Sequence, residues 1–187
     1  MVMAGEGMKG ISLLRRENVF RGKIVRSFHL DEVMLPNGAK VRLECIDHPG
    51  AAAVVPYLKP DRIVLLSQFR PVVGKALWEI PAGTLKRGER PRTCALRELA
   101  EETGFKARKL KPVSSIFTTP GFTNEVIHIF KATGLSQVGA RPDADEILET
   151  AVFSTVEIRR MVARGMITDS KTISGLALCG LFQKGFR

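Results

Sequence analysis

The segment from Gly83 to Phe105 constrains the fold more than any other part of the chain, because it combines helix signals with closely spaced carboxylates. It reads GTLKRGERPRTCALRELAEETGF. Pro91 suits the first turn of a helix, the residues that follow as far as Thr103 are good helix formers, and Gly104 suits a left-handed C-cap. The sequence therefore predicts a helix of roughly three turns that ends at Gly104.

Three glutamates lie close together on this predicted helix. With about 3.6 residues per turn, Glu98 and Glu102 are one turn apart on the same face, and Glu101 lies beside them. Like charges at this spacing destabilise a helix by roughly 0.2–0.5 kcal/mol per pair. A hard divalent cation would offset that repulsion, so the pattern favours a Mg²⁺ site, with Mn²⁺ as the alternative metal. The other interpretation is a solvated acidic face that binds nothing.

These residues resemble the Nudix box, G-x5-E-x7-R-E-U-x-E-E-x-G-U, in which U is an apolar residue. Every specified position is matched, by Gly83, Glu89, Arg97, Glu98, Leu99, Glu101, Glu102, Gly104 and Phe105. The resemblance implies a Nudix hydrolase, an enzyme that cleaves nucleoside diphosphates linked to another moiety with the help of divalent metal ions and water. It also implies that the motif forms a loop, a helix and a second loop.

The resemblance further implies roles for single residues of the motif. The expected metal ligands are three carboxylates and one backbone carbonyl, those of Glu98, Glu101, Glu102 and Ala82. Glu89 would be an accessory ligand or would support one, and Arg97 would be its ion-pair partner.

Length and composition limit the alternatives. A chain of 187 residues is long enough for one domain and a short appendage. The hydrophobic fraction of 44% and the charged fraction of 26% are typical of a globular protein, and no apolar run has the roughly 18 residues that cross a membrane. The start of the chain lacks the basic-then-apolar order of a secretory signal, so we expect a cytoplasmic protein. Cys45, Cys94 and Cys179 are widely spaced, which suggests neither disulfides nor a zinc site.

The formal net charge of +10 has two interpretations, attraction of an anionic substrate or binding of a nucleic-acid backbone. The densest basic stretch, Lys106 to Lys111, contains no aromatic residue on which a base could stack. A solvated basic face that binds nothing is therefore the favoured interpretation of this stretch, and a nucleic-acid partner is disfavoured. An RNA-binding or RNA-end-processing module stays open as the rival class.

The rest of the chain reads as strands with a few helices. Two alternating runs within residues 20–47 flank Asn37-Gly38, a strong hairpin signal. Further strands are predicted over 51–58, 62–69, 77–80, 113–117, 126–131 and 147–153, and further helices over 155–164 and 170–184. This order favours an α+β or α/β sandwich. The resemblance implies the Nudix α/β/α sandwich with a mixed sheet, preceded by a small antiparallel N-terminal sheet. We therefore expect an N-terminal tail over 1–18, an N-terminal β-region over 19–48 and the Nudix domain over 49–187.

Two segments outside the box resemble the ADP-ribose pyrophosphatase subfamily. The first is Thr119 to Glu125, with the sequence TPGFTNE. It implies substrate-binding roles for Pro120, Gly121 and Phe122, although Pro-Gly is also a common turn between strands. The second is QFRP followed by WEIPAG. In it Arg70 would contact the pyrophosphate and Glu79 a ribose hydroxyl, and the alternative for each is a surface ion pair.

The acidic segment RPDADEILE, residues 141–149, is the third resemblance. Subfamily members often carry the catalytic base on this loop. Glu146 is the first candidate for the base and Glu149 the second, while an ordinary acidic surface loop is the alternative.

One departure concerns the adenosine side of the substrate. Relatives often read R-E before the H-P-G turn, whereas this chain has Leu43-Glu44 before His48. Glu44 remains a candidate contact. Arg42 is adjacent, but in a strand it would point to the opposite face from residue 43. Phe28 is a candidate for stacking on a base, with a core position as the alternative.

Together these observations predict Mg²⁺-dependent hydrolysis of ADP-ribose to AMP and ribose 5-phosphate. The alternatives within the same chemistry are ADP- or GDP-sugars, dinucleotides and oxidised nucleotides. The resemblance also implies a homodimer in which the N-terminal strands of one subunit help to build the substrate pocket of the other.

Overall fold

The computed structural model describes residues 10–22, 25–139 and 148–183. The chain divides into two compact units. The smaller unit comprises Met1–Pro49 and Thr119–Glu125, and the larger unit comprises Gly50–Thr118 and Val126–Arg187. In the part of the chain that the structure describes, no helix has the length and apolar character needed to cross a membrane.

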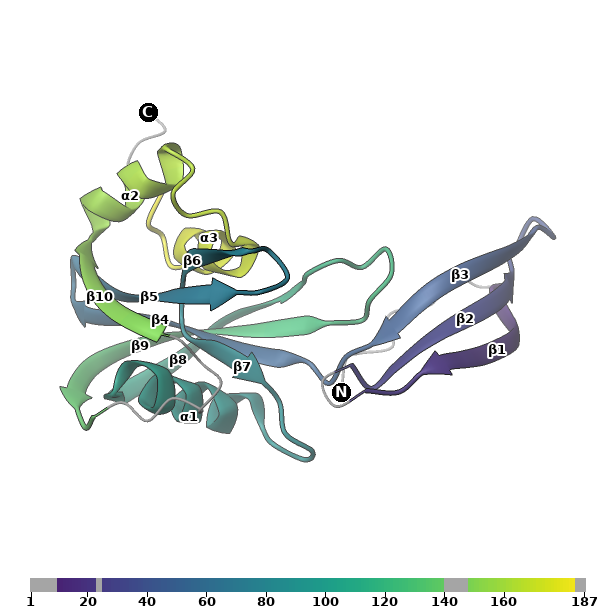
Figure 1. The fold of residues 1–187 in the computed structure, drawn as a ribbon, viewed down its shortest axis with the longest axis horizontal. Coiled ribbons are helices and arrows are strands. Elements are labelled where there is room, and N and C mark those ends of the chain that lie inside the picture. Colours follow the sequence, from purple (N-terminus) through teal and green to yellow (C-terminus); the bar gives the residue numbers. More distant parts are fainter. Residues whose placement is uncertain (1–9, 23–24, 140–147, 184–187) are drawn as a thin grey trace. The chain divides into compact units, whose positions relative to one another are not determined.

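The smaller unit is a three-stranded antiparallel sheet in the order β1-β2-β3, shown in purple and blue in Figure 1. Its strands are β1 (Ser12–Phe20), β2 (Ser27–Met34) and β3 (Lys40–Asp47). The predicted turn between the last two is confirmed, since Gly38 has a φ of 82° and its amide donates to the Leu35 carbonyl. β2 is the central strand, and its residues alternate between buried and partly buried along its whole length.

β1 is not foreseen by the sequence analysis, which treats residues 1–18 as a tail. Two register shifts, between Leu13 and Arg15 and between Asn18 and Phe20, interrupt its pairing with β2. These shifts break the two-residue alternation by which a strand is recognised. The strand is also exposed along its entire length, so no run of core residues marks it.

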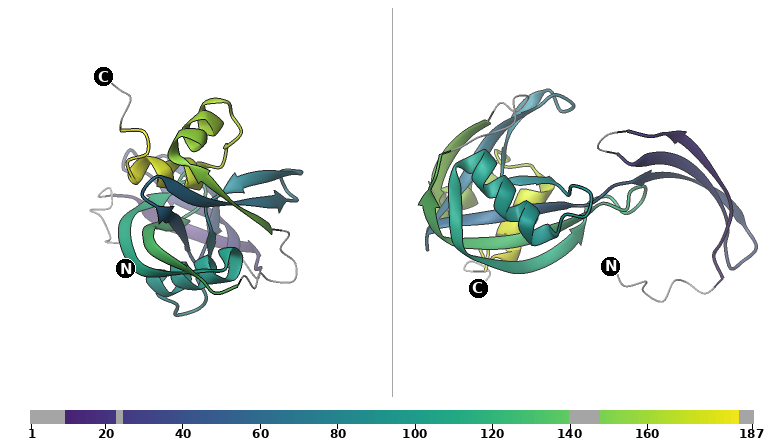
Figure 2. Two further views of the ribbon diagram at one scale, coloured as in Figure 1. Left: turned by 90° about the vertical axis from the view of Figure 1, so that its left-hand side faces the viewer. Right: turned by 90° about the horizontal axis from the view of Figure 1, so that it is seen from below.

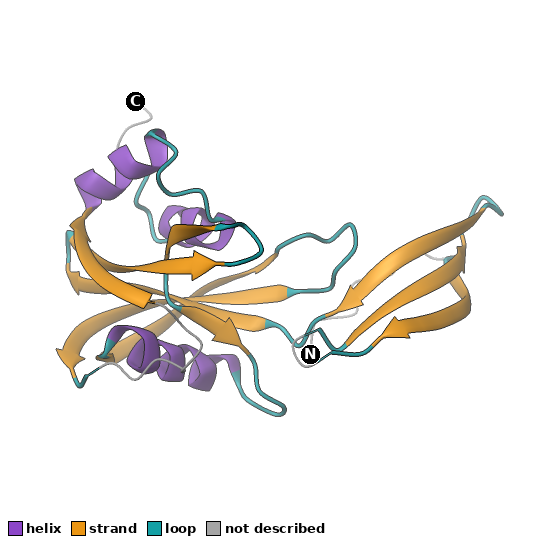
Figure 3. Ribbon diagram, in the orientation of Figure 1, coloured by secondary structure: helices purple, strands orange, loops and turns teal. Residues whose placement is uncertain are grey.

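The larger unit is a seven-stranded mixed sheet in the order β10-β5-β4-β9-β8, with β6 on β5 and β7 on β4. Only β4 and β9 pair in parallel among the described strands. The strands are β4 (Ala51–Lys59), β5 (Arg62–Arg70), β6 (Lys75–Glu79), β7 (Ala82–Thr84), β8 (Phe105–Phe117), β9 (Val126–Gln137) and β10 (Leu148–Ser154). Helix α1 (Pro91–Thr103) covers one face, and α2 (Thr155–Ala163) and α3 (Ser170–Leu178) cover the other (Figures 2 and 3).

The central strand β4 has apolar residues on both faces because a helical layer covers each of them. Ala53 and Val55 join the core beneath α2 and α3, whereas Ala52 and Val54 join the core beneath α1. This explains the uninterrupted apolar run in the sequence. The α/β/α sandwich with a mixed sheet is thus confirmed.

Helix α1 begins and ends as predicted. Pro91 occupies its first turn, and Gly104 is a left-handed C-cap with φ of 71°. Two other predicted elements differ in length. β8 begins at Phe105 instead of residue 113 and includes the basic stretch. The charged residues of that stretch hid the strand from the sequence pattern, although such residues are common on an edge strand like β8. α3 ends at Leu178 instead of residue 184, and Gly180 follows it with a φ of 85°.

Candidate active site

The glutamate-rich helix α1 lies against the short strand β7, and the contact is close at Gly83. A β-carbon placed on Gly83 would lie 1.7 Å from Oε1 of Glu98, so only glycine fits beside that side chain. Glu102 accepts a hydrogen bond from the Ala82 amide, with 3.0 Å between the nitrogen and Oε2. Helix and strand therefore bring two of the predicted ligand side chains to the Ala82–Gly83 backbone.

Arg97 is the centre of the ion pairs on α1. Its Nε and Nη2 donate to the two oxygens of Glu89, each at 3.0 Å, which is the pairing that the resemblance implies. Its Nη1 donates to Glu98 at 2.6 Å and to Glu101 at 3.0 Å. These hydrogen bonds from Arg97 lower the pKa of the Glu89 carboxyl to about 2, and the same contacts raise the pKa of Arg97.

Cys94 adds a contact that the sequence analysis did not anticipate. Its thiol is fully buried and donates to the Gly83 carbonyl, with 3.3 Å between sulfur and oxygen. Burial raises the pKa of this thiol to about 12, so it stays protonated and can donate. The motif does not specify position 94, and no spacing rule identifies it.

The donor set suits a hard divalent cation. Glu98 and Glu102 are 8% and 3% exposed, and burial of neighbouring carboxylates is costly unless positive charge accompanies them. Among the described residues, the Arg97 guanidinium forms ion pairs with Glu89, Glu98 and Glu101. Carboxylate oxygens are the ligands that Mg²⁺ prefers. In this structure Glu98 and Glu101 accept hydrogen bonds from Arg97, and Glu102 accepts one from the Ala82 amide.

Arg70 and Glu79 form a second ion pair in the larger unit. Arg70 Nε and Nη2 donate to the two oxygens of Glu79 at 2.8 and 2.6 Å. Glu79 is 1% exposed and also accepts from Lys171 of α3. The predicted ribose contact of Glu79 therefore has to compete with two cations. Lys171 was not predicted because it lies far from the motif along the chain, although it closely follows Asp169, the N-cap of α3.

The other predicted substrate contacts lie in the smaller unit. Phe28 is paired with Ile46 across β2 and β3, and Glu44 with Leu30. Arg42 forms an ion pair with Glu17 of β1 at 3.7 Å. Pro120, Gly121 and Phe122 lie in the segment that pairs with β3, where the Ile46 amide donates to the Phe122 carbonyl at 2.7 Å.

The candidates for the catalytic base are only partly described. Glu146 lies outside the described residues. Glu149 is exposed on β10 and is paired with Ser67 of β5. The base thus stays a prediction.

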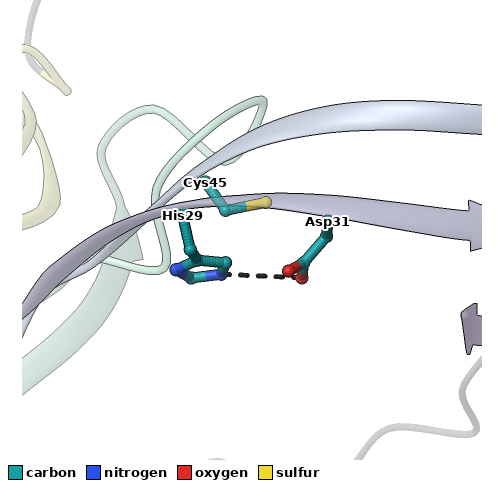
Figure 4. Close-up of side chains that lie close together, drawn as sticks. All are labelled: His29, Asp31 and Cys45. Atoms are coloured by element: carbon teal, nitrogen blue, oxygen red, sulfur yellow. Dashed lines mark ion pairs between the residues drawn. The ribbon is translucent and has the colours of Figure 1, made fainter. Parts of the chain in front are cut away.

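A polar cluster in the smaller unit was also not anticipated. Figure 4 shows His29 and Asp31 of β2 beside Cys45 of β3, with 3.5 Å between His29 Nε2 and Asp31 Oδ2. Arg16 binds both oxygens of Asp31 at 2.7 and 2.6 Å, and burial raises the pKa of the Cys45 thiol. A metal ion at this cluster would need the Asp31 carboxylate, which Arg16 occupies, and Cys45 as a thiolate, so the cluster is better described as a polar network that joins three strands.

Comparison with known proteins identifies the family. The NUDIX domain matches residues 47–173, which is more than half of the chain. The chain belongs to the Nudix family. It is therefore a Nudix hydrolase, with Glu98, Glu101 and Glu102 of the motif on α1.

Two relatives cover most of this Nudix hydrolase. It is 39% identical to "Methanol dehydrogenase activator" of Bacillus methanolicus, over 86% of this chain and 87% of that protein. It is 37% identical to "ADP-ribose pyrophosphatase" of Bacillus subtilis, over 85% of this chain and 86% of that protein. A solved structure described as "Crystal structure of ADP compounds hydrolase" has a TM-score of 0.82 at 20% identity, over 97% of this chain and 98% of that one, which shows the shared fold.

Proposed function

We propose that this Nudix hydrolase cleaves the pyrophosphate bond of ADP-ribose, in a Mg²⁺-dependent reaction that yields AMP and ribose 5-phosphate. The observation that carries the proposal is the complete motif over residues 83–105, centred on α1, in a chain that aligns over most of its length with an ADP-ribose pyrophosphatase. The position of Arg70 supports it, because a guanidinium suits phosphate oxygens.

Each part of the site has a proposed task. Glu98, Glu101 and Glu102, with the Ala82 carbonyl, would hold the metal, and Mn²⁺ would fit the same donors. When bound, the metal supplies neutralisation of the pyrophosphate and activation of water. Arg97 fixes the orientation of the motif carboxylates. Glu146 is the proposed base that takes the proton from water, with Glu149 as the second candidate.

The test is a product assay with ADP-ribose and Mg²⁺, resolved by ion exchange, with Glu102→Gln as the matched control. AMP that forms with the wild type and not with the variant supports both the substrate and the metal site. ADP-glucose, diadenosine compounds and capped RNA are assayed alongside. Cleavage of one of these with ADP-ribose untouched would keep the chemistry and overturn the substrate, and salt-dependent RNA binding without hydrolysis would favour the RNA module.

A second candidate function comes from the relative named methanol dehydrogenase activator, which is as similar as the pyrophosphatase. In this function the chain would increase the activity of an alcohol dehydrogenase. Addition of the wild type and of Glu102→Gln to a methanol dehydrogenase assay separates the possibilities. Activation by the wild type alone would make it a consequence of hydrolysis, and activation by both would point to a binding effect.

We also propose that the protein is a homodimer located in the cytoplasm. The exposed strand β1, with its apolar residues Leu13, Val19 and Phe20, supports the dimer because an edge of this kind favours pairing with a second copy. Light scattering after size exclusion tests it. A monomer at micromolar concentration would contradict the dimer, and recovery outside the cytoplasm after cell fractionation would contradict the location.

A further inference from the structure

Glu79 is a buried carboxylate that two cations share. Its side chain is 2% exposed, whereas that of Arg70 is 37% exposed and that of Lys171 is 12% exposed. A carboxylate removed from water in this way requires charged or hydrogen-bonding partners. Arg70 approaches it from the solvent-accessible side of the group, and Lys171 is the partner that is itself largely buried.

Lys171 is fixed by the first turn of α3. Its ammonium lies 3.1 Å from Oδ2 of Asp169, the N-cap residue, in addition to its contact with Glu79. The next residue, Thr172, accepts a hydrogen bond from the Ile80 amide at 2.9 Å. Glu79 and Ile80 directly precede the Pro81–Gly83 segment that meets Glu98, so α3 is tied to the strand that leads into the site.

Arg70 keeps part of its guanidinium available. It uses Nε and Nη2 for Glu79, and among the described residues Nη1 has no hydrogen-bond partner. Arg70 also lies within electrostatic range of the motif, because the carboxylates of Glu79 and, to a smaller extent, Asp169 and Glu102 raise its pKa. A guanidinium held along one edge presents its other edge to an anion in a fixed orientation.

We propose that Lys171 is a positioning residue that acts through Glu79 on Arg70, and that Arg70 presents Nη1 to a phosphate oxygen of the substrate. The identity of that anion rests on the proposed function. Arg70, Lys171, Glu79 and Asp169 carry no net charge together. Without Lys171, two carboxylates would compete for Arg70 alone, which would draw the guanidinium inwards and reduce its attraction for a polyanion.

Steady-state kinetics with ADP-ribose test the proposal. Lys171→Met is expected to raise KM about tenfold while kcat changes less than about threefold. The reason is that the lost contact stabilises the bound substrate and the transition state to the same extent. Lys171→Arg keeps the charge and is expected to restore KM to within about threefold of the wild type. In an Arg70→Ala background, Lys171→Met is expected to leave KM unchanged, since the two residues act in series.

A charge-matched variant separates position from net charge. Asp169→Asn retains a good N-cap, and combined with Lys171→Met it restores the neutral balance of the group. If Lys171 positions Arg70, KM of this double variant stays raised. Recovery of the wild-type KM would show that only the net charge matters and would overturn the proposal, as would an equal effect of Lys171→Met with and without Arg70.

An NMR readout does not depend on activity and so distinguishes failure of this inference from failure of the proposed function. The Arg70 Nε–Hε resonance, assigned by its absence in Arg70→Lys, reports the bond to Glu79. It is expected to shift in Lys171→Met and to return in Lys171→Arg, with melting curves to show that both variants are folded. An unchanged resonance in Lys171→Met would overturn the positioning role even if ADP-ribose proved not to be the substrate.

Discussion

Substitution of Gly83 by alanine should displace Glu98, a predicted metal ligand, and leave its carboxylate group chemically unchanged. The added β-carbon would lie 1.7, 2.1 and 2.8 Å from Oε1, Cδ and Cγ of Glu98. Ordinary contacts are about 3.5 Å, so all three atoms overlap and the side chain has to leave its present rotamer. The hydrogen bond from Arg97 Nη1 to Glu98 is then lost as well. Overpacking of this kind costs roughly 1–3 kcal/mol of unfolding free energy.

Two measurements follow for Gly83→Ala. Hydrolysis is expected to fall about 10- to 100-fold, which is the usual range when a group that supports a metal ligand is disturbed. Urea unfolding is expected to show the stability loss in the wild-type background. In a Glu98→Ala background the overlap is absent, so the same substitution is expected to cost less than about 0.5 kcal/mol.

Gly121→Ala is the stability control, because a β-carbon there would meet no atom within 4 Å and its φ is not in the left-handed region. The steric reasoning would be refuted if Gly83→Ala cost as much in the Glu98→Ala background as in the wild type. Full hydrolytic activity of Gly83→Ala would refute the assignment of Glu98 as a ligand.

Three further predictions concern stability and titration. Because Arg97 lowers the pKa of Glu89 to about 2, the stability from ionised Glu89 is fully present above the usual carboxyl pKa of about 4.3 and is lost as the pH falls towards 2. The difference in unfolding free energy between the wild type and Glu89→Gln should therefore be constant above about pH 5.5 and shrink below it in urea titrations. Tyr57 is the only tyrosine, and burial raises its pKa to about 12, so an ultraviolet titration of the native protein should have its midpoint near 12 and move to about 10 on unfolding. Leu99→Ala should cost about 2–5 kcal/mol in urea unfolding because Leu99 is fully buried, and Leu96→Ala on the same helix, 36% exposed, should cost much less.

The elements that could be predicted are those that carry their own signal in the sequence. Helix α1 carries its own start at Pro91 and its own stop at Gly104, and the hairpin between β2 and β3 carries its own turn at Gly38. β4 was recognisable because burial on both faces leaves an unbroken apolar run. In each of these cases local backbone chemistry and the burial pattern point to the same structure.

Two features could not be predicted, β1 because its sequence pattern is broken and the Glu79–Lys171 pair because its partners are distant in sequence. β1 is held in place by its pairing with β2. Its two register shifts break the two-residue alternation by which a strand is recognised in a sequence. The Glu79–Lys171 pair joins residues separated by 92 positions, and the sequence around one residue does not predict the other as its partner. The resemblance supplied candidate roles for Glu79 and Arg70, while their mutual pairing required the structure.

The two arginines of the larger unit show why contacts, and not residue type, decide between positioning and binding. Arg97 uses Nε, Nη1 and Nη2 for three carboxylates and is 21% exposed, so its donors are committed to the protein. Arg70 binds Glu79 through Nε and Nη2 only, and its Nη1 has no partner among the described residues. A substrate phosphate would have to break existing ion pairs to reach Arg97, whereas Arg70 can accept it as an additional partner. The sequence has the same guanidinium at both positions, and the arrangement of carboxylates around each one supports the proposal that Arg70, and not Arg97, contacts the substrate.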